Sequence, residues 1–322
     1  MNIIGLVINI LIFPGGLFAI LLGLFLTGVD RKIYARLQRR VGPPVYQPCI
    51  DMIKLSQKEI LIPRTANCTA FRFAPLLGFA GMLAAIAIIP VTGIYSGLDQ
   101  SGDLLVLLYL LSTPALALII GASASGSPYS SVGLSREMTM VLAYEIPLLV
   151  VLLTVGMRVG MAGGGTAVFS LGSIVNFQLK NGALLFDLPM LPAVLAFLCC
   201  IPGTIGVVPF DIPEAETELA EGPLLEYSGA GLAMFKLTGG LKMLVLCAMA
   251  VALFFPSGIG SFWLINLLWF IFKCIVISFF TITFVRATRA RMRLDQAYKF
   301  YLLFPTALAL ISLVLTLLSF RI

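Results

Sequence analysis

Apolar runs long enough to cross a membrane recur along the whole chain. A transmembrane helix needs roughly 20 apolar residues to cross a hydrocarbon core about 30 Å thick. We expect eight such helices: Ile4–Thr27, Phe73–Ile94, Leu104–Ala124, Met138–Met157, Leu188–Val208, Gly229–Phe255, Phe262–Val285 and Tyr298–Leu318. Of the 322 residues only 11% are charged, against about a quarter in an average soluble domain. The predicted fold is an all-α integral membrane protein, a single polytopic domain over residues 1–322.

Lysine and arginine predict the orientation of this domain, because cytoplasmic loops retain positive charge. The loops after the first and seventh helices are basic: Arg31, Lys32, Arg36, Arg39, Arg40, Lys54, Lys58, Arg64, Arg72, Arg286, Arg289, Arg291, Arg293 and Lys299. The opposite side carries only Arg158, Lys180 and Arg321. We therefore expect both termini outside, and cytoplasmic loops at about 28–72, 125–137, 209–228 and 286–297. The first span lacks the basic start and small-residue cleavage site of a secretory signal, so we expect it to be retained. The net charge of +6 follows from this topology and does not indicate nucleic-acid binding.

The chain offers few ligands for a redox cofactor. Its cysteines have no C-x-x-C spacing, which argues against iron–sulfur and zinc sites: Cys49, Cys68, Cys199, Cys200, Cys247 and Cys274. It has no histidine, which excludes a His-ligated haem or metal and a Ser-His-Asp triad. We expect no cofactor or metal in this chain, and electrons to move in partner subunits.

The first cytoplasmic loop begins as a basic continuation of the first helix and breaks at Gly42-Pro43-Pro44. After Pro48, isoleucines alternate with charged residues, the pattern of a helix in the membrane interface. This segment could contact lipid alone or form a docking platform for a peripheral subunit. The spacing does not decide between them.

The segment PFDIPEAETELAEGPLLEYSG places six acids beside a membrane helix: Asp211, Glu214, Glu216, Glu218, Glu221 and Glu226. Pro213 suits the first position of a helix, and Gly222-Pro223 would end it. On such a helix Asp211, Glu214, Glu218 and Glu221 would share one stripe about 80° wide. Carboxylates so close are stable when they face water or cations, or when some are protonated. A solvated helix face is the alternative explanation.

Ionisable residues inside spans are costly and mark ion pathways or contacts with partners. Glu145 lies in the fourth span, about two turns beyond Arg136 and Glu137. Lys236 and Lys242 flank Gly239-Gly240 in the sixth span, and Lys273 lies in the seventh. Glu145 with one of these lysines would form a hydrated track for protons. A buried pair that fixes helix packing is the structural alternative.

Four motifs carry a family resemblance: ARLQRRVGPP with QPCIDMIKLSQKE, REMTMVLAYE, the acidic segment, and RATRARMRLDQ. The chain resembles the eight-helix subunit shared by respiratory complex I (its subunit 1, or H) and the membrane-bound NiFe hydrogenases. The resemblance implies a prokaryotic cell-membrane subunit that joins a peripheral redox arm to antiporter-like membrane subunits and begins ion translocation.

By matching position, the resemblance implies two sets of residues. The coupling set holds the matched residues Arg136, Glu145, Asp211, Glu214, Glu216, Glu218 and Glu226, to which we add Glu137, Glu221, Lys236, Lys242 and Lys273 from the sequence itself. The set expected to dock the peripheral arm holds the matched residues Arg36, Arg40, Asp51, Lys54, Arg286, Arg291, Arg293 and Asp295, with Gln296 in the same motif, and we add Arg39 from the basic first loop.

Departures from the quinone-reactive branch resemble the hydrogenase branch. RVGPPVYQP lacks the longer glycine-containing insert of quinone-type members, and Gly239-Gly240 stands where these usually carry a Glu-aromatic pair. The resemblance then implies hydrogenase-like large and small subunits and an iron–sulfur protein as partners, which would hold the NiFe centre and the clusters. A quinone-reducing complex and a sulfur-reducing relative are alternatives. A stand-alone secondary transporter is a rival of another class, but we find no internal repeat of the kind transporters show.

Overall fold

A computed structural model describes residues 12–319, except 14, 92, 98–103, 163–164, 166 and 261 and the side chains of 216 and 217. The helices of these residues are α2 (Gly16–Leu37), α3 (Gln47–Ser56), α4 (Cys68–Ile88), α5 (Leu104–Ser125), α6 (Pro128–Ala162), α7 (Leu171–Asn181), η1 (Leu184–Phe186), η2 (Leu188–Met190), α8 (Leu191–Ile205), α9 (Glu216–Leu219), η3 (Gly222–Leu224), α10 (Gly229–Phe254), α11 (Trp263–Ser278), the π-helix η4 (Phe279–Thr283), α12 (Phe284–Thr288) and α13 (Leu294–Leu318). No named strand occurs among these residues.

Seven helical segments of the described chain are long and apolar enough to cross a membrane: α4, α5, α6, η2 with α8, α10, α11 to α12, and α13. They correspond to seven of the eight predicted spans. The remaining predicted span, Ile4–Thr27, begins outside the described residues, and its described part belongs to α2, which continues to Leu37. Arg321 also lies outside the described residues.

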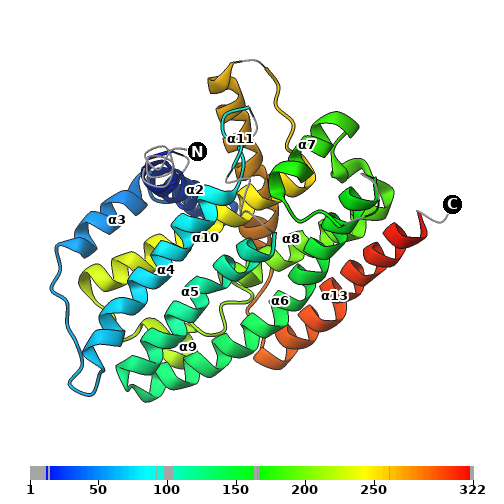
Figure 1. Cartoon of the computed structure of the whole chain (residues 1–322). Helices are drawn as coiled ribbons and strands as arrows, with labels where there is room; N and C mark the ends of the chain where they lie inside the picture. The colour runs from blue at the N-terminus through cyan, green and yellow to red at the C-terminus, as the bar shows by residue number, and fades with distance from the viewer. Residues whose placement is uncertain are drawn as a thin grey trace.

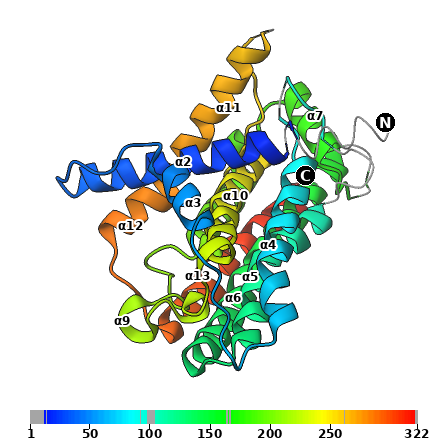
Figure 2. The ribbon, with the colours of Figure 1, turned by 90° about the vertical axis from the view of Figure 1, so that its left-hand side faces the viewer.

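The spans surround α10. Of its apolar window 89% is buried, against 28% for α13, so α10 is central and α13 peripheral. Helices α4, α5, α6 and α13 run nearly parallel as one layer (Figure 1), and α2 crosses beside α10 (Figure 2). Small residues permit the crossing, as in many membrane bundles. A Cβ on Gly23 of α2 would lie 2.9 Å from the carbonyl oxygen of Gly240 in α10.

Side chains from two neighbouring helices satisfy the carbonyl groups at the C-terminal end of α10. Gln178 of α7 donates to Ala252 O and Leu253 O at 3.1 and 3.0 Å. Lys273 of α11 donates from Nζ to Phe255 O at 2.8 Å and also to Ser257 O. A helix end in apolar surroundings needs such partners, because its last carbonyls have none within the helix. The amphipathic helix α7 was not predicted.

The bundle has one end rich in charged loops. α9, the start of α6 and the start of α13 lie together there, while α7 and the end of α13 lie at the opposite end (Figure 1). The third predicted loop, 125–137, is mostly helix, because α6 begins at Pro128. Gly133 and Ser130 of this extension pack against the acidic segment: Ser130 Oγ donates to Gly222 O at 3.2 Å.

Candidate functional site

The acidic segment is not the long helix that its sequence predicts. Only Glu216–Leu219 forms an α-helical turn, and the chain then passes through positive φ at Ala220, Glu221 and Gly222. Positive φ ends a right-handed helix, and Gly222 is required at its position because a Cβ there would lie 2.3 Å from Pro213 O. The predicted stripe of four carboxylates is therefore wrong.

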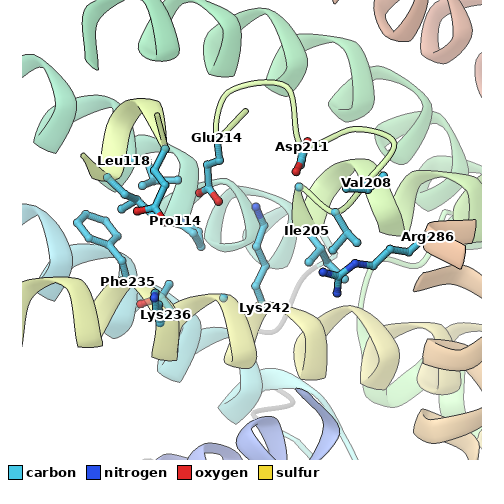
Figure 3. Close-up of a pocket in the computed structure, with 16 residues that line it drawn as sticks. Pro114, Leu118, Ile205, Val208, Asp211, Glu214, Phe235, Lys236, Lys242 and Arg286 are labelled. Carbon is cyan, nitrogen blue, oxygen red and sulfur yellow. The ribbon is translucent and has the colours of Figure 1, made fainter. Parts of the chain in front are cut away.

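The acids of this segment separate instead. Asp211 is held by Arg291, and Glu218 accepts a hydrogen bond from Arg136 of α6. Glu214 points inward toward Lys242 of α10 (Figure 3). Glu221 lines a cavity, whereas Glu226 is half-buried and lies outside that cavity. The backbone of Glu216 lies in α9, and its side chain is outside the described residues.

A cavity of about 340 Å³ lies between the acidic segment and α10. Its walls are apolar in part, formed by residues such as Leu118, Val208 and Phe235 (Figure 3). Three acids and three cations line it: Asp211, Glu214, Glu221, Lys236, Lys242 and Arg286. We call this space the larger cavity.

A smaller cavity of about 30 Å³ adjoins the larger one and shares Glu214 and Lys242 with it. Glu137 of α6 lines only the smaller of the two. A polar space of this size holds about one water molecule. Glu137, Lys242 and Glu214 therefore converge on a water-sized polar space.

Lys242 is the centre of this cluster. It is 5% exposed, and it interacts electrostatically with Glu137, Glu214 and Glu145. Among the described residues no carboxylate lies within 4.0 Å of its ammonium group. Glu145 lines neither cavity and lies farther along α6. Of the lysines in the sixth and seventh spans, Lys242 is therefore the one that interacts electrostatically with Glu145.

Two other lysines of the coupling set lie elsewhere. Lys236 is exposed at the rim of the larger cavity. Lys273 binds carbonyls beyond the end of α10, at Phe255 and Ser257. Lys242 and Phe254 are twelve residues apart on one helix, about 18 Å at 1.5 Å per residue. The structure therefore does not bring Lys273 together with the cluster.

Burial and neighbouring charge perturb the acids outside the spans. The pKa of Glu214 is raised to about 7. Burial is the largest cause, the negative charges of Glu137 and Asp211 add to it, and the positive charge of Lys242 opposes them. The hydrogen bond and charge of Arg136 hold the pKa of Glu218 below its usual value. Glu214 is thus poised to exchange a proton near neutral pH, whereas the pKa of Glu218 is shifted in the opposite direction.

The residues expected to dock a peripheral arm occupy the charged end. Arg31 and Gln47 donate to Asp51 at 2.9 and 3.0 Å. Burial acts to raise the pKa of Asp51, but these hydrogen bonds and the charge of Arg31 outweigh it and lower the pKa. The first-loop cations are exposed: Arg36, Arg39, Arg40 and Lys54.

The seventh loop and the acidic segment enclose a groove of about 320 Å³ at the same end. Arg291 and Arg293 line it together with Asp295, and Arg136 and Glu218 form another part of its lining. Arg286 faces the larger cavity instead (Figure 3). The predicted docking residues of the seventh loop therefore divide between an outer groove and the inner cavity.

Sequence reasoning missed Asp30 and Thr283, which contact each other in the buried part of the structure. A charged residue at the end of an apolar run was the available signal for Asp30. It also missed the Oη of Tyr144, beside Glu145, which is buried with no hydrogen-bond partner among the described residues. Nothing in the sequence marks that environment.

The cluster holds no group of three or more His, Cys, Asp or Glu side chains suited to a metal ion, nor does any other part of the described chain. The arrangement is suited to moving protons or ions between charged side chains and water.

Comparison with known proteins decides the family. The family model for NADH dehydrogenase matches residues 8–317. The chain belongs to this family. The match extends over almost the whole length of the chain, so the residues that line the cavities and both charged loops lie within it.

Named relatives lie in both branches of the family. The chain is 37% identical over 235 residues to hydrogenase-4 component C of Escherichia coli, covering 72% of this chain and 70% of the relative. It is 34% identical to formate hydrogenlyase subunit 4 of the same organism, covering 84% and 86%. It is also 34% identical to the H subunit of NADH-quinone oxidoreductase from Ehrlichia ruminantium, covering 84% and 78%.

A solved structure agrees with these relatives. One chain of the membrane-bound sulfane sulfur reductase, an archaeal respiratory membrane complex, matches with a TM-score of 0.85 and 28% identity, covering 97% of this chain and 99% of that one. The family resemblance seen in the sequence motifs is confirmed. The protein is a membrane subunit of a complex I-like or hydrogenase-type respiratory complex.

Proposed function

We propose that this chain is the membrane anchor and coupling subunit of an energy-converting NiFe-hydrogenase-type complex in a prokaryotic cytoplasmic membrane. It docks a peripheral arm and links electron transfer, from ferredoxin to protons, to translocation of protons or sodium ions. Hydrogenase-like large and small subunits and an iron–sulfur protein carry the NiFe centre and the clusters. Antiporter-like subunits are its membrane partners, and the charged loops face the cytoplasm, with both termini outside.

The observation that carries this proposal is the ionic cluster around Lys242. Glu214 belongs to the charged end of the bundle, while Glu137 and Glu145 lie on the membrane helix α6. Lys242 interacts with all three, and a water-sized cavity lies between Glu137 and Glu214. Ionisable groups at membrane depth are costly, and by default they mark such a pathway. A change of charge at the docking end can thus reach Glu145 through a single buried lysine.

Replacing Glu145 by Gln tests the proposal. The variant removes the charge and keeps the shape of the side chain, so we expect ion pumping into vesicles to stop while the peripheral redox centres stay assembled. Asp187→Asn is the matched control, because Asp187 pairs with Arg158 at 2.7 Å at the opposite end of the bundle. Unchanged pumping in Glu145→Gln, with pumping also unchanged in the control, would remove Glu145 from the pathway.

A quinone-site subunit is the second candidate. The larger cavity supports it, because about 340 Å³ with partly apolar walls is in the range of small-molecule sites. The match to the sulfane sulfur reductase supports a sulfur-reducing complex as a third variant. Purification in mild detergent separates the three: nickel that co-purifies with the chain supports the hydrogenase, and iron without nickel supports either alternative. Reduction of a quinone analogue by the purified complex then identifies the quinone enzyme.

A further inference from the structure

A buried aspartate outside both cavities contacts the segment that presents Arg286. Asp30, on α2, is 7% exposed. Thr283, the last residue of η4, donates from Oγ1 to Oδ1 of Asp30 at 2.6 Å. A carboxylate in such surroundings is stable only when its oxygens have partners. One oxygen of Asp30 is therefore held by a hydroxyl group.

The second oxygen faces an arginine. Nη1 of Arg286 lies 3.6 Å from Oδ2 of Asp30, and the guanidinium lies 4.4 Å from the ring centroid of Tyr34, one turn after Asp30 on α2. The same side chain points into the larger cavity (Figure 3). Arg286 thus stands between α2 and the cavity, and Asp30 with Tyr34 holds it from the side of α2.

The π-helix η4 sets the register of these contacts. A π-helix carries an extra residue relative to an α-helix, and one residue changes the facing direction of everything after it by about 100°. Thr283 closes η4 and Arg286 follows three residues later, which places them on one face. Without the extra residue, the face that carries Thr283 and Arg286 would turn away from Asp30.

We propose that Asp30 is a positioning residue that keeps the charge of Arg286 at the rim of the larger cavity. Three carboxylates line that cavity, and Asp30 competes with them for the guanidinium. Without Asp30, the guanidinium moves toward Asp211, Glu214 and Glu221 and makes the interior of the cavity more positive. The inference deepens the proposed function, because it identifies what controls the charge of the proposed ion path.

The same helix links this contact to the docking end. Arg31, the next residue after Asp30, pairs with Asp51 of α3 at 2.9 Å. A partner that displaces α3 or turns α2 therefore moves Asp30 relative to Arg286. The charge inside the cavity follows the docking of the arm by this route.

The potential inside the cavity can be measured with a thiol placed at Gly239. This residue lines the larger cavity, and a Cβ there would meet no atom within 4 Å. The full complex carrying Gly239→Cys, with Cys49 and Cys68 replaced by Ser, is treated with anionic and cationic methanethiosulfonates. The ratio of the two labelling rates reports the local charge. Rates are corrected with the same complex lacking Gly239→Cys.

Asp30→Asn should raise the anionic-to-cationic ratio by on the order of threefold or more, as expected when a unit charge moves a few ångströms in a medium of intermediate dielectric constant. Thr283→Val, which removes the hydrogen bond and keeps all charges, should raise it less and in the same direction. Asp187→Asn, an ion-pair variant at the far end, should leave it unchanged. In the double variant Asp30→Asn and Arg286→Gln, the rise in the labelling ratio should disappear.

Two results would overturn the inference. An unchanged ratio in both Asp30→Asn and Thr283→Val would mean that Arg286 is held without Asp30. A rise that persists in the double variant would mean that the effect does not pass through Arg286. The labelling ratio requires no ion pumping, so it is measured separately from the proposed function. Loss of pumping in Glu145→Gln with no change in the Asp30 ratio would support the ion path and reject the positioning role.

Discussion

The guanidinium of Arg291 holds the carboxylate of Asp211 through two hydrogen bonds, from Nε to Oδ1 at 2.6 Å and from Nη2 to Oδ2 at 2.8 Å. The contact joins the seventh loop to the acidic segment, and beside it the amide of Met292 donates to Pro209 O at 3.1 Å. A lysine cannot form this paired contact, because it lacks the planar fork.

Arg291→Lys should therefore loosen the seventh loop. Loss of one charged hydrogen bond costs about 1–3 kcal/mol, so hydrogen exchange at the amide of Met292 should rise on the order of tenfold. Arg293→Lys is the matched control, because the side chain of Arg293 is exposed on the same loop. Equal exchange rates in the two variants would show that the paired contact does not hold the loop.

Glu214 should titrate near neutral pH. Its pKa is about 7 in the folded protein, against an ordinary value of 4.5, chiefly because of burial. The folded state then binds the proton more tightly than the unfolded state, so this group's contribution to stability is full below about pH 4.5 and is lost as the pH rises through 7. Glu214→Gln should flatten that fall in the thermal midpoint.

An infrared titration checks the assignment. The carbonyl stretch of one protonated carboxyl group should disappear with a midpoint near pH 7 and be absent in Glu214→Gln. In Glu218→Gln the band should remain, because Arg136 holds the pKa of Glu218 below its usual value. A band that survives in Glu214→Gln would assign the proton to another residue.

Lys242→Met should destabilise the complex. Removing a buried cation leaves Glu137 and Glu214 without their compensating charge, and an uncompensated buried charge is strongly destabilising. The thermal midpoint should fall, and a second change, Glu214→Gln, should restore part of the loss. Lys236→Met is the matched control: its side chain is exposed at the cavity rim, so we expect a change within about 0.5 kcal/mol. Equal effects of the two lysine variants would argue against a buried cluster.

Lys273→Met should affect stability and leave ion pumping intact. The ammonium group donates to Phe255 O and Ser257 O, and its loss removes hydrogen bonds from a charged donor, which are worth about 1.5–3 kcal/mol each. Thermal unfolding and vesicle pumping of the same preparation separate the two effects. Pumping that stops while the thermal midpoint is unchanged would return Lys273 to the coupling set.

Hydropathy predicted the bounds of a span closely where the whole helix is apolar and contacts lipid or other apolar side chains. Gly229–Phe255 differs from α10 by one residue, and Leu104–Ala124 differs from α5 by one. The prediction for α6 began ten residues late, because the first turns of that helix are polar and pack on Gly222 and Pro223. Hydropathy does not detect a helix that is stabilised by contact with another loop.

The sequence predicted which residues belong to the candidate site, but it did not predict how they are arranged in space. Charge inside an apolar run was enough to select Glu145 and Lys242. Helical periodicity then failed for the acidic segment, because it assumes continuous helical φ and ψ angles, and the turn at Glu221 breaks them. The association of Glu137 with Lys242 joins α6 to α10, and no local pattern in the sequence contains that contact.

The burial of α10 has a consequence for biogenesis. A ribosome delivers α10 to the membrane after α2, α4, α5, α6 and α8, and the helix carries Lys242 near its middle. A lysine at that depth opposes lateral release into lipid by about 2.5–3.5 kcal/mol. Helices already inserted supply the carboxylates that offset this penalty, so α10 should leave the translocon into a preformed protein socket and not into bare bilayer. The order of the helices along the chain thus places α10 after α6, the helix that supplies Glu137 and Glu145 to Lys242.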